Sequence, residues 1–170
     1  MRPIQCHIGY LLRYALFSFS PERSSSPCYS QRFEILRQLA GTFYLEQPLW
    51  LFDYAMLAFQ TGEYQISAES FARLRRGQRF FLVPMERTCA LSNPAQPTHS
   101  QKVRIRVTNL SPNTDKGWAK IEYPLEFNEF NDPVPFSRRS FESRNQVPRL
   151  GASILCTILL RPSGPFAEPL

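Results

Sequence analysis

The feature that most constrains the fold of this chain is a strict alternation of side-chain types that begins at Lys102. Val103, Ile105 and Val107 alternate with basic residues, so a strand here places its apolar side chains on one face and its charges on the other. Residues 153–160 alternate in the same way. Both segments are therefore predicted to be half-buried β-strands.

Turn signals separate these strands from others. Residues 111–115, with the sequence SPNTD, predict a turn, and residues 117–121 predict a further strand directly after it. The chain of 170 residues holds 15 prolines and 7 glycines, a composition that favours short segments over one long helical array. Short strands joined by turns predict a small β-barrel.

The region before residue 92 has the apolar spacing of α-helices. Ser30 is a suitable N-cap for a helix over residues 30–40, and Pro48 suits the first turn of a second helix. A third helix is predicted over residues 64–74, with Gly77 as its left-handed terminator. These helices are amphipathic, so each needs a surface to cover its apolar face.

The second and third helices resemble a single tetratricopeptide-type hairpin. Small residues at Ala55 and Ser67, a turn at residues 62–64 and the aromatic Phe71 occupy the positions where that repeat has such residues. The resemblance implies an antiparallel helical hairpin. One hairpin cannot bury its own faces, so it either packs on something else or belongs to a longer array.

Four short blocks near the C-terminus occur in the order and spacing of a known family. They are KGWAKI at residues 116–121, DPVPFS at 132–137, LGASI at 150–154 and GPFA at 164–167. This part of the chain resembles a cold-shock domain, a small barrel of the OB type that binds single-stranded nucleic acid. The resemblance implies a five-stranded antiparallel OB-type barrel over residues 101–170.

The predicted fold class is α+β, with an N-terminal helical hairpin followed by the barrel. The chain divides into an N-terminal segment over residues 1–29, a helical region over 30–91, a linker over 92–100 and the barrel over 101–170. The N-terminal segment carries arginines and a serine run, with no acid before Glu22. It is either a flexible start or an amphipathic or targeting segment.

The resemblance to cold-shock domains implies a binding face made of aromatic rings and cations. Trp118 and Phe136 retain aromatic positions of the family motifs and are predicted to stack on bases, while packing in the core or at its rim is the alternative for both rings. Lys120, Pro133 and Pro135 replace aromatic or histidine positions, which predicts weak and largely sequence-independent binding. The cations predicted to contact the nucleic-acid backbone are Lys116, Lys120, Arg104, Arg106 and Arg138.

The net charge of the chain favours acidic partners. A formal charge of +6 suits single-stranded RNA or DNA, an acidic protein or an anionic surface. The basic residues are spread along the chain, so an ordinary solvated surface is the alternative. A further group of arginines at the end of the third helix either binds phosphate or complements the helix dipole. These arginines are Arg73, Arg75, Arg76 and Arg79.

A second functional hypothesis is a protein-interaction module. In this hypothesis the helical hairpin and the barrel together dock on a protein partner through large aromatic side chains. These side chains are Trp50, Phe52, Phe59, Phe80 and Phe127. Their exposure would support the hypothesis, whereas burial of all five would remove its basis.

The sequence predicts no enzyme, no metal site and no cofactor. It has no catalytic motif, its four cysteines lie far apart, and it has only two histidines. Widely spaced cysteines indicate reduced thiols and a cytoplasmic location. The apolar segment over residues 8–19 is interrupted by Arg13 and is too short to span a bilayer, so no membrane partner is expected.

Overall fold

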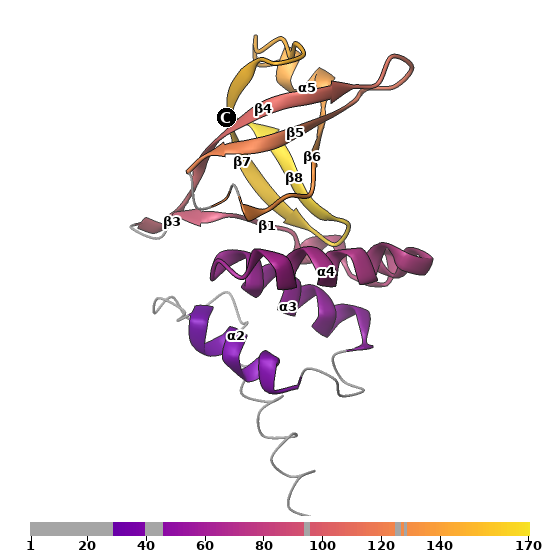
Figure 1. Cartoon of the computed structure of the whole chain (residues 1–170), viewed down its shortest axis with the longest axis vertical. Coiled ribbons are helices and arrows are strands. Elements are labelled where there is room, and N and C mark those ends of the chain that lie inside the picture. Colours follow the sequence, from indigo (N-terminus) through magenta and orange to yellow (C-terminus); the bar gives the residue numbers. More distant parts are fainter. Residues whose placement is uncertain (1–28, 40–45, 94–95, 125–126, 128) are drawn as a thin grey trace, which may run out of the picture.

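The computed structural model of the protein describes residues 29–39, 46–93, 96–124, 127 and 129–170. A layer of helices lies at one end of a β-barrel (Figure 1). The predicted α+β class is therefore confirmed. The expectations for the N-terminal segment fall almost entirely outside the described residues.

The helical layer consists, in the described part, of α2 (Tyr29–Gln38), α3 (Pro48–Gln60) and α4 (Tyr64–Arg75). The predictions for α3 and α4 are confirmed, with a proline in the first turn of α3. Gly62 has a φ of 85° in the turn between them, a conformation that favours glycine. α2 begins one residue before Ser30, so Ser30 lies inside the helix and is not its N-cap.

Helices α3 and α4 pack through the predicted small residues. The Ser67 hydroxyl donates a hydrogen bond to the Ala55 carbonyl at 2.8 Å. Close by, the rings of Phe52 and Phe71 meet edge to face, with centroids 6.3 Å apart. The chain thus contains the expected helical hairpin, while its membership of the tetratricopeptide family stays a prediction.

The chain leaves α4 through two 3₁₀ segments, η2 (Arg76–Leu82) and η3 (Met85–Arg87). Gly77 has a φ of 63°, as predicted for the terminator of α4, and Gln78 follows with a φ of 58°. Two successive left-handed residues turn the chain sharply away from the α4 axis. No residue of η2 is fully buried, so this segment lies at the molecular surface.

Five strands of the described chain close into a barrel (Figure 1). They are β4 (Lys102–Leu110), β5 (Lys116–Tyr123), β6 (Val134–Ser137), β7 (Ser153–Arg161) and β8 (Gly164–Pro169). Their order is β4-β5-β6-β8-β7, and β7 pairs with β4 to close the ring. Helix α5 (Arg138–Glu142) connects β6 to β7. This arrangement agrees with the predicted OB-type barrel.

The prediction that the barrel is antiparallel throughout is wrong for one pair of strands. β6 and β8 run parallel, with Phe136 opposite Ala167. The reason is geometric. Strands that alternate in direction cannot close a ring when their number is odd, so a five-stranded barrel needs at least one parallel pair.

The segment interpreted as a linker contains strands. Within residues 92–100, β2 (Ser92–Asn93) pairs with β3 (Gln96–Ser100) in a separate small sheet. Just before this segment, β1 (Cys89–Ala90) pairs with the end of β7. β1 therefore belongs to the barrel sheet although it precedes the predicted start of the barrel at Gln101. β1 thus connects the end of the helical region directly to the sheet of the barrel.

Aromatic side chains join the helical layer to the barrel. Phe59 of α3 contacts Phe127 and Phe130, with ring centroids 5.8 Å and 5.0 Å away, and Tyr64 of α4 lies 5.7 Å from Phe127. All four side chains are buried and belong to the same cluster as the barrel interior. The helical hairpin therefore covers an apolar face by packing on the barrel, as expected for an isolated hairpin.

Candidate nucleic-acid interface

The outer surface of β4 and β5 carries most of the predicted binding residues. Along β5, Lys116, Trp118 and Lys120 alternate with buried, inward-facing residues. Arg104 and Arg106 occupy exposed positions of β4. Strand alternation thus brings these five residues to one side of the sheet. The cations of this surface, called the basic face below, are Lys102, Arg104, Arg106, Lys116 and Lys120.

Positive charge is only partly compensated on the basic face. Arg106 lies directly opposite Lys120 in the pairing of β4 and β5. Glu122 accepts hydrogen bonds from Ser153 Oγ at 2.6 Å and from the Arg106 guanidinium, and these bonds hold the pKa of Glu122 below its usual range. Within the described residues, the other four cations of the basic face form no ion pair. The surface therefore keeps an excess of positive charge.

Trp118 begins a row of half-buried side chains that crosses three strands. It lies opposite Pro135 in the pairing of β5 and β6. Because Phe136 pairs with Ala167 in parallel, the preceding residues Pro135 and Phe166 lie side by side on the outer surface. The row of Trp118, Pro135 and Phe166 is called the aromatic band below.

Three side chains extend this surface beyond the residues predicted from the sequence. Arg161 covers the ring of Phe166, with the guanidinium carbon 3.7 Å from the ring centroid, and also pairs with Glu168. Tyr123 is 58% exposed at the end of β5. Alternation along β8 is the sequence signal for Phe166, but the parallel pairing that places it beside β6 has no signal in the sequence.

Phe136 does not belong to the outer surface. It shares the inward phase of β6 with Val134 and is 1% exposed. Its ring lies over Gly117 and meets the Phe141 ring edge to face, with centroids 5.4 Å apart. The prediction that Phe136 stacks on a base is therefore wrong, and its alternative of core packing is what the structure contains.

Arg138 lies at the loop end of the barrel and not on the strands. It begins α5, has Glu142 at 3.9 Å, and lines an open cleft of about 290 Å³ together with residues 112–115. Lys116 pairs with Ser137, the residue just before α5, so this cleft adjoins one end of the basic face. Arg138 therefore lies outside the strands, on the border of the basic face next to Lys116.

Asp115 fixes the shape of the cleft. Its carboxylate accepts hydrogen bonds from the Ser137 hydroxyl and, at 2.8 Å, from the Arg139 backbone N–H. Its carbonyl accepts from the Arg138 N–H at 2.8 Å. The hydrogen bonds from Ser137 and Arg139 hold the pKa of the Asp115 carboxyl below its usual range. The turn predicted at residues 111–115 is therefore present and is tied to the start of α5.

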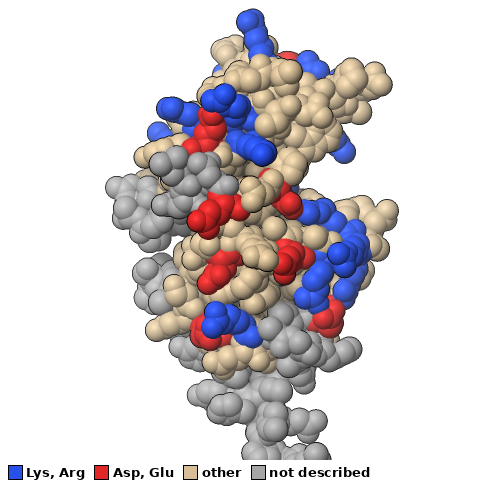
Figure 2. Space-filling model, viewed as in Figure 1, with Lys and Arg blue, Asp and Glu red and all other residues tan. Residues whose placement is uncertain are grey.

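The arginines at the end of α4 form a second basic cluster. Arg73 and Arg79 pair with the same carboxylate, Glu46, and Arg75 pairs with an aspartate that precedes β6. Arg76 is exposed and forms no ion pair within the described residues. Figure 2 shows basic side chains gathered on one side of the helical layer.

The aromatic residues predicted to dock a protein partner are mostly unavailable. Phe52, Phe59 and Phe127 are buried within the chain, so that prediction is wrong for these three, and Trp50 and Phe80 are half-buried. A different apolar group is exposed on η2 and η3. Its members are Phe81 and Leu82, each 72% exposed, and Met85, 61% exposed.

Metal-ligating and thiol side chains are sparse in the described part of the chain, where no group of three or more could hold a metal ion. Burial raises the pKa of Cys89 to about 11 and that of Cys156 to about 12, so both thiols are protonated at neutral pH. Among the same residues, no helix has the length and apolar character needed to cross a membrane.

Comparison of the chain with models of protein families, with curated proteins and with solved structures found no match.

Proposed function

We propose that the barrel binds single-stranded RNA or DNA, weakly and with little sequence preference, through the basic face and the aromatic band. The observation that carries the proposal is the direct opposition of Arg106 and Lys120 beside the half-buried Trp118. Like charges directly opposite one another destabilise a sheet. Glu122 offsets the charge of Arg106 but leaves Lys120 without an ion pair among the described residues. A phosphate bound at Lys120 supplies a counter-charge there, and the neighbouring indole ring offers a base a surface on which to stack.

The small number of rings supports weak binding. Stacking on an aromatic side chain contributes about 1 to 3 kcal/mol per base. Phe136 is in the core, and Arg161 covers one face of Phe166, so Trp118 is the principal stacking ring of the aromatic band. Phosphate contacts then supply much of the affinity, and we expect binding to weaken steeply as salt concentration rises.

Oligonucleotide titrations test this proposal. Binding of fluorescein-labelled oligothymidylate and oligouridylate is measured by fluorescence anisotropy at several salt concentrations. Lys120→Ala is expected to reduce the slope of log affinity against log salt by about 0.7, because one phosphate contact is lost. Trp118→Ala is expected to weaken binding about tenfold with the slope unchanged, because stacking involves no counterion.

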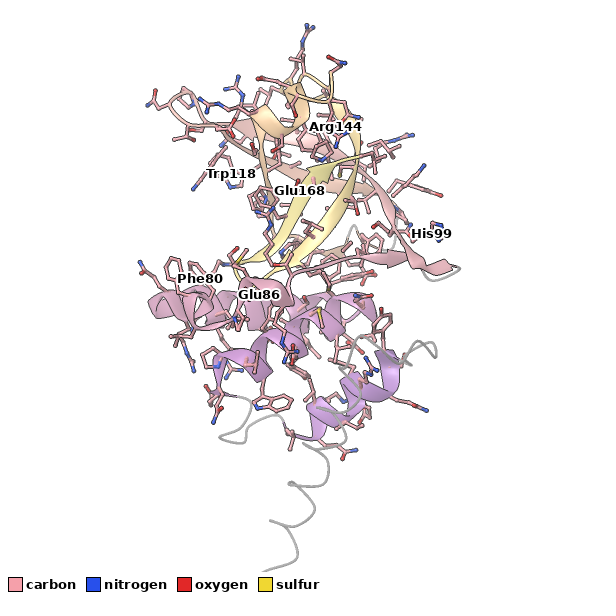
Figure 3. All side chains as sticks on the ribbon, turned by 180° about the vertical axis from the view of Figure 1, so that it is seen from behind. Phe80, Glu86, His99, Trp118, Arg144 and Glu168 are labelled. Carbon is pink, nitrogen blue, oxygen red and sulfur yellow. The ribbon has the colours of Figure 1, made fainter. Side chains whose placement is uncertain are left out.

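Two exposed side chains after α5 provide matched controls. Arg144→Ala removes a cation, and Val147→Ala reduces an apolar side chain that is 60% exposed. Figure 3 shows Arg144 apart from Trp118. Neither control is expected to change binding. Failure of both oligonucleotides to bind at low salt, or equal losses in the control variants, would contradict the proposal.

A further inference from the structure

The end of α4 is joined to two loops of the barrel by Arg75. Its guanidinium donates a hydrogen bond to the Ser163 carbonyl in the β7–β8 turn at 3.4 Å and another to the Asp132 carboxylate before β6 at 3.0 Å. Gly164 lies at the same contact, since a Cβ there would be 3.1 Å from Arg75 Nη1. The arginine-rich start of η2 therefore lies at the edge of the barrel (Figure 1).

The aromatic band ends near this same turn. Phe166 is two residues beyond Gly164, and Arg161 covers the Phe166 ring from the other strand of the hairpin. Arg161 pairs with Gly164 in the register of β7 and β8, which places it next to the turn that Arg75 contacts. A continuous series of contacts thus leads from the aromatic band to the end of α4.

Beyond Arg75, η2 exposes the two kinds of side chain that bind single strands. Arg76 is exposed, and Phe81 is 72% exposed with its ring centroid 4.2 Å from that of the half-buried Phe80. Figure 3 shows Phe80 on the same side of the molecule as Trp118. The nearby carboxylate of Glu46 is paired with other arginines. The segment η2 thus carries an exposed cation and a supported, exposed ring, which suit a phosphate and a base of the same strand.

We propose that a bound single strand continues from the outer barrel surface across the β7–β8 turn onto η2, where Phe81 stacks on a base and Arg76 contacts a phosphate. This second half of the site exists only if the barrel binds nucleic acid as proposed above. One OB-type barrel covers about 4 to 16 nucleotides. A strand held by both halves is longer than the strand that the barrel alone holds.

Oligonucleotide length separates the two halves of the site. Oligothymidylates of about 5 and about 20 nucleotides are titrated by fluorescence anisotropy with the wild-type chain, Phe81→Ala and Arg76→Glu. Each variant is expected to weaken binding of the long strand about tenfold and to leave the short strand unaffected. A long strand offers more overlapping binding positions than a short one, which raises its apparent affinity. Comparing each variant with the wild type at the same strand length removes this effect.

Leu82→Ala is the matched control, because Leu82 has the same exposed fraction on the same segment but cannot stack on a base. Arg144→Glu controls for charge reversal. If Trp118→Ala weakens both lengths while Phe81→Ala and Arg76→Glu weaken neither, the extension onto η2 is wrong and the proposed function stands. If neither the short nor the long strand binds, the extension onto η2 and the proposed function are both wrong. A loss with Leu82→Ala equal to that with Phe81→Ala would rule out base stacking at η2.

Discussion

Gly117 and Phe136 face each other across β5 and β6, and their contact leaves no room for a side chain at position 117. The Phe136 ring lies over the glycine, so an added Cβ would overlap its ring atoms. The buried Phe141 packs edge to face against the Phe136 ring and limits any movement of that ring. The glycine in the KGWAKI block therefore serves the packing of the barrel core.

Gly117→Ala is expected to lower the free energy of unfolding by about 1 to 3 kcal/mol, because the new methyl group forces the packed Phe136 ring to move. Urea unfolding measures the effect. Phe136→Leu should cost less stability in the Gly117→Ala protein than in wild type, since the smaller side chain makes room for the methyl group. Strictly additive effects of the two substitutions would contradict this account of the glycine.

Asp53 is a buried carboxyl on α3 with incomplete partners. One oxygen lies 3.5 Å from Arg87 Nη1, and the other has no hydrogen-bond partner in the described structure. Burial raises the pKa of Asp53 from its usual 3.8 to about 6, and the charge of Arg87 offsets only part of this rise. The folded protein therefore binds this proton more tightly than the unfolded chain does.

The raised pKa predicts that Asp53 destabilises the fold progressively as pH rises from about 4 to above 6, because only the unfolded chain ionises freely there. Asp53→Asn removes this titration. The free energy of unfolding of the variant, relative to wild type, should increase by up to about 3 kcal/mol between pH 4 and pH 7. Urea unfolding of both proteins at several pH values measures this difference in free energy. The contributions of the carboxyl groups that both proteins share cancel in it. A difference that does not change with pH would contradict the prediction.

At the scale of elements, local periodicity was sufficient for the helices and the long strands. α3 and α4 follow from apolar spacing with Pro48, Gly62 and Gly77 as boundary signals, and β4 and β7 follow from their alternation. These signals are local, since each depends on residues a few positions apart. The pairing of β6 with β8 depends on closure of the whole ring, so no local pattern reports it. For this reason the sequence does not indicate that Phe166 lies beside β6.

Phe136 illustrates a different limit of the sequence. Its predicted place on the binding face rests on the match of the block DPVPFS to a family motif, although this block is shorter than the motif. A missing residue shifts the alternation of every side chain after it. On β6 the inward phase includes Val134 and Phe136, and Pro135 takes the outward position. Alternation within the strand, which motif matching ignores, decides which face a ring occupies.

At the scale of the whole molecule, the shared aromatic core makes the helices and the barrel depend on each other. Phe59 contacts Tyr64 on α4 and the two phenylalanines that precede β6, Phe127 and Phe130. β1 adds a second connection, because it leaves the helical region and pairs directly with β7. Large parts of the barrel end that faces the helices would be exposed to water without them. We therefore expect one cooperative unfolding transition.

Phe59→Ala tests this dependence, because it removes the ring at the centre of the shared core. The variant is expected to lose about 3 to 5 kcal/mol of stability. The chain has two tryptophans, so Trp50→Phe leaves Trp118 to report on the barrel, and Trp118→Phe leaves Trp50 to report on α3. The fluorescence midpoints of the two single-tryptophan proteins should move together when Phe59→Ala is added. A barrel midpoint that stays in place while the helical midpoint falls would mean that the barrel folds without the helical layer, and that the aromatic contacts stabilise the helices alone.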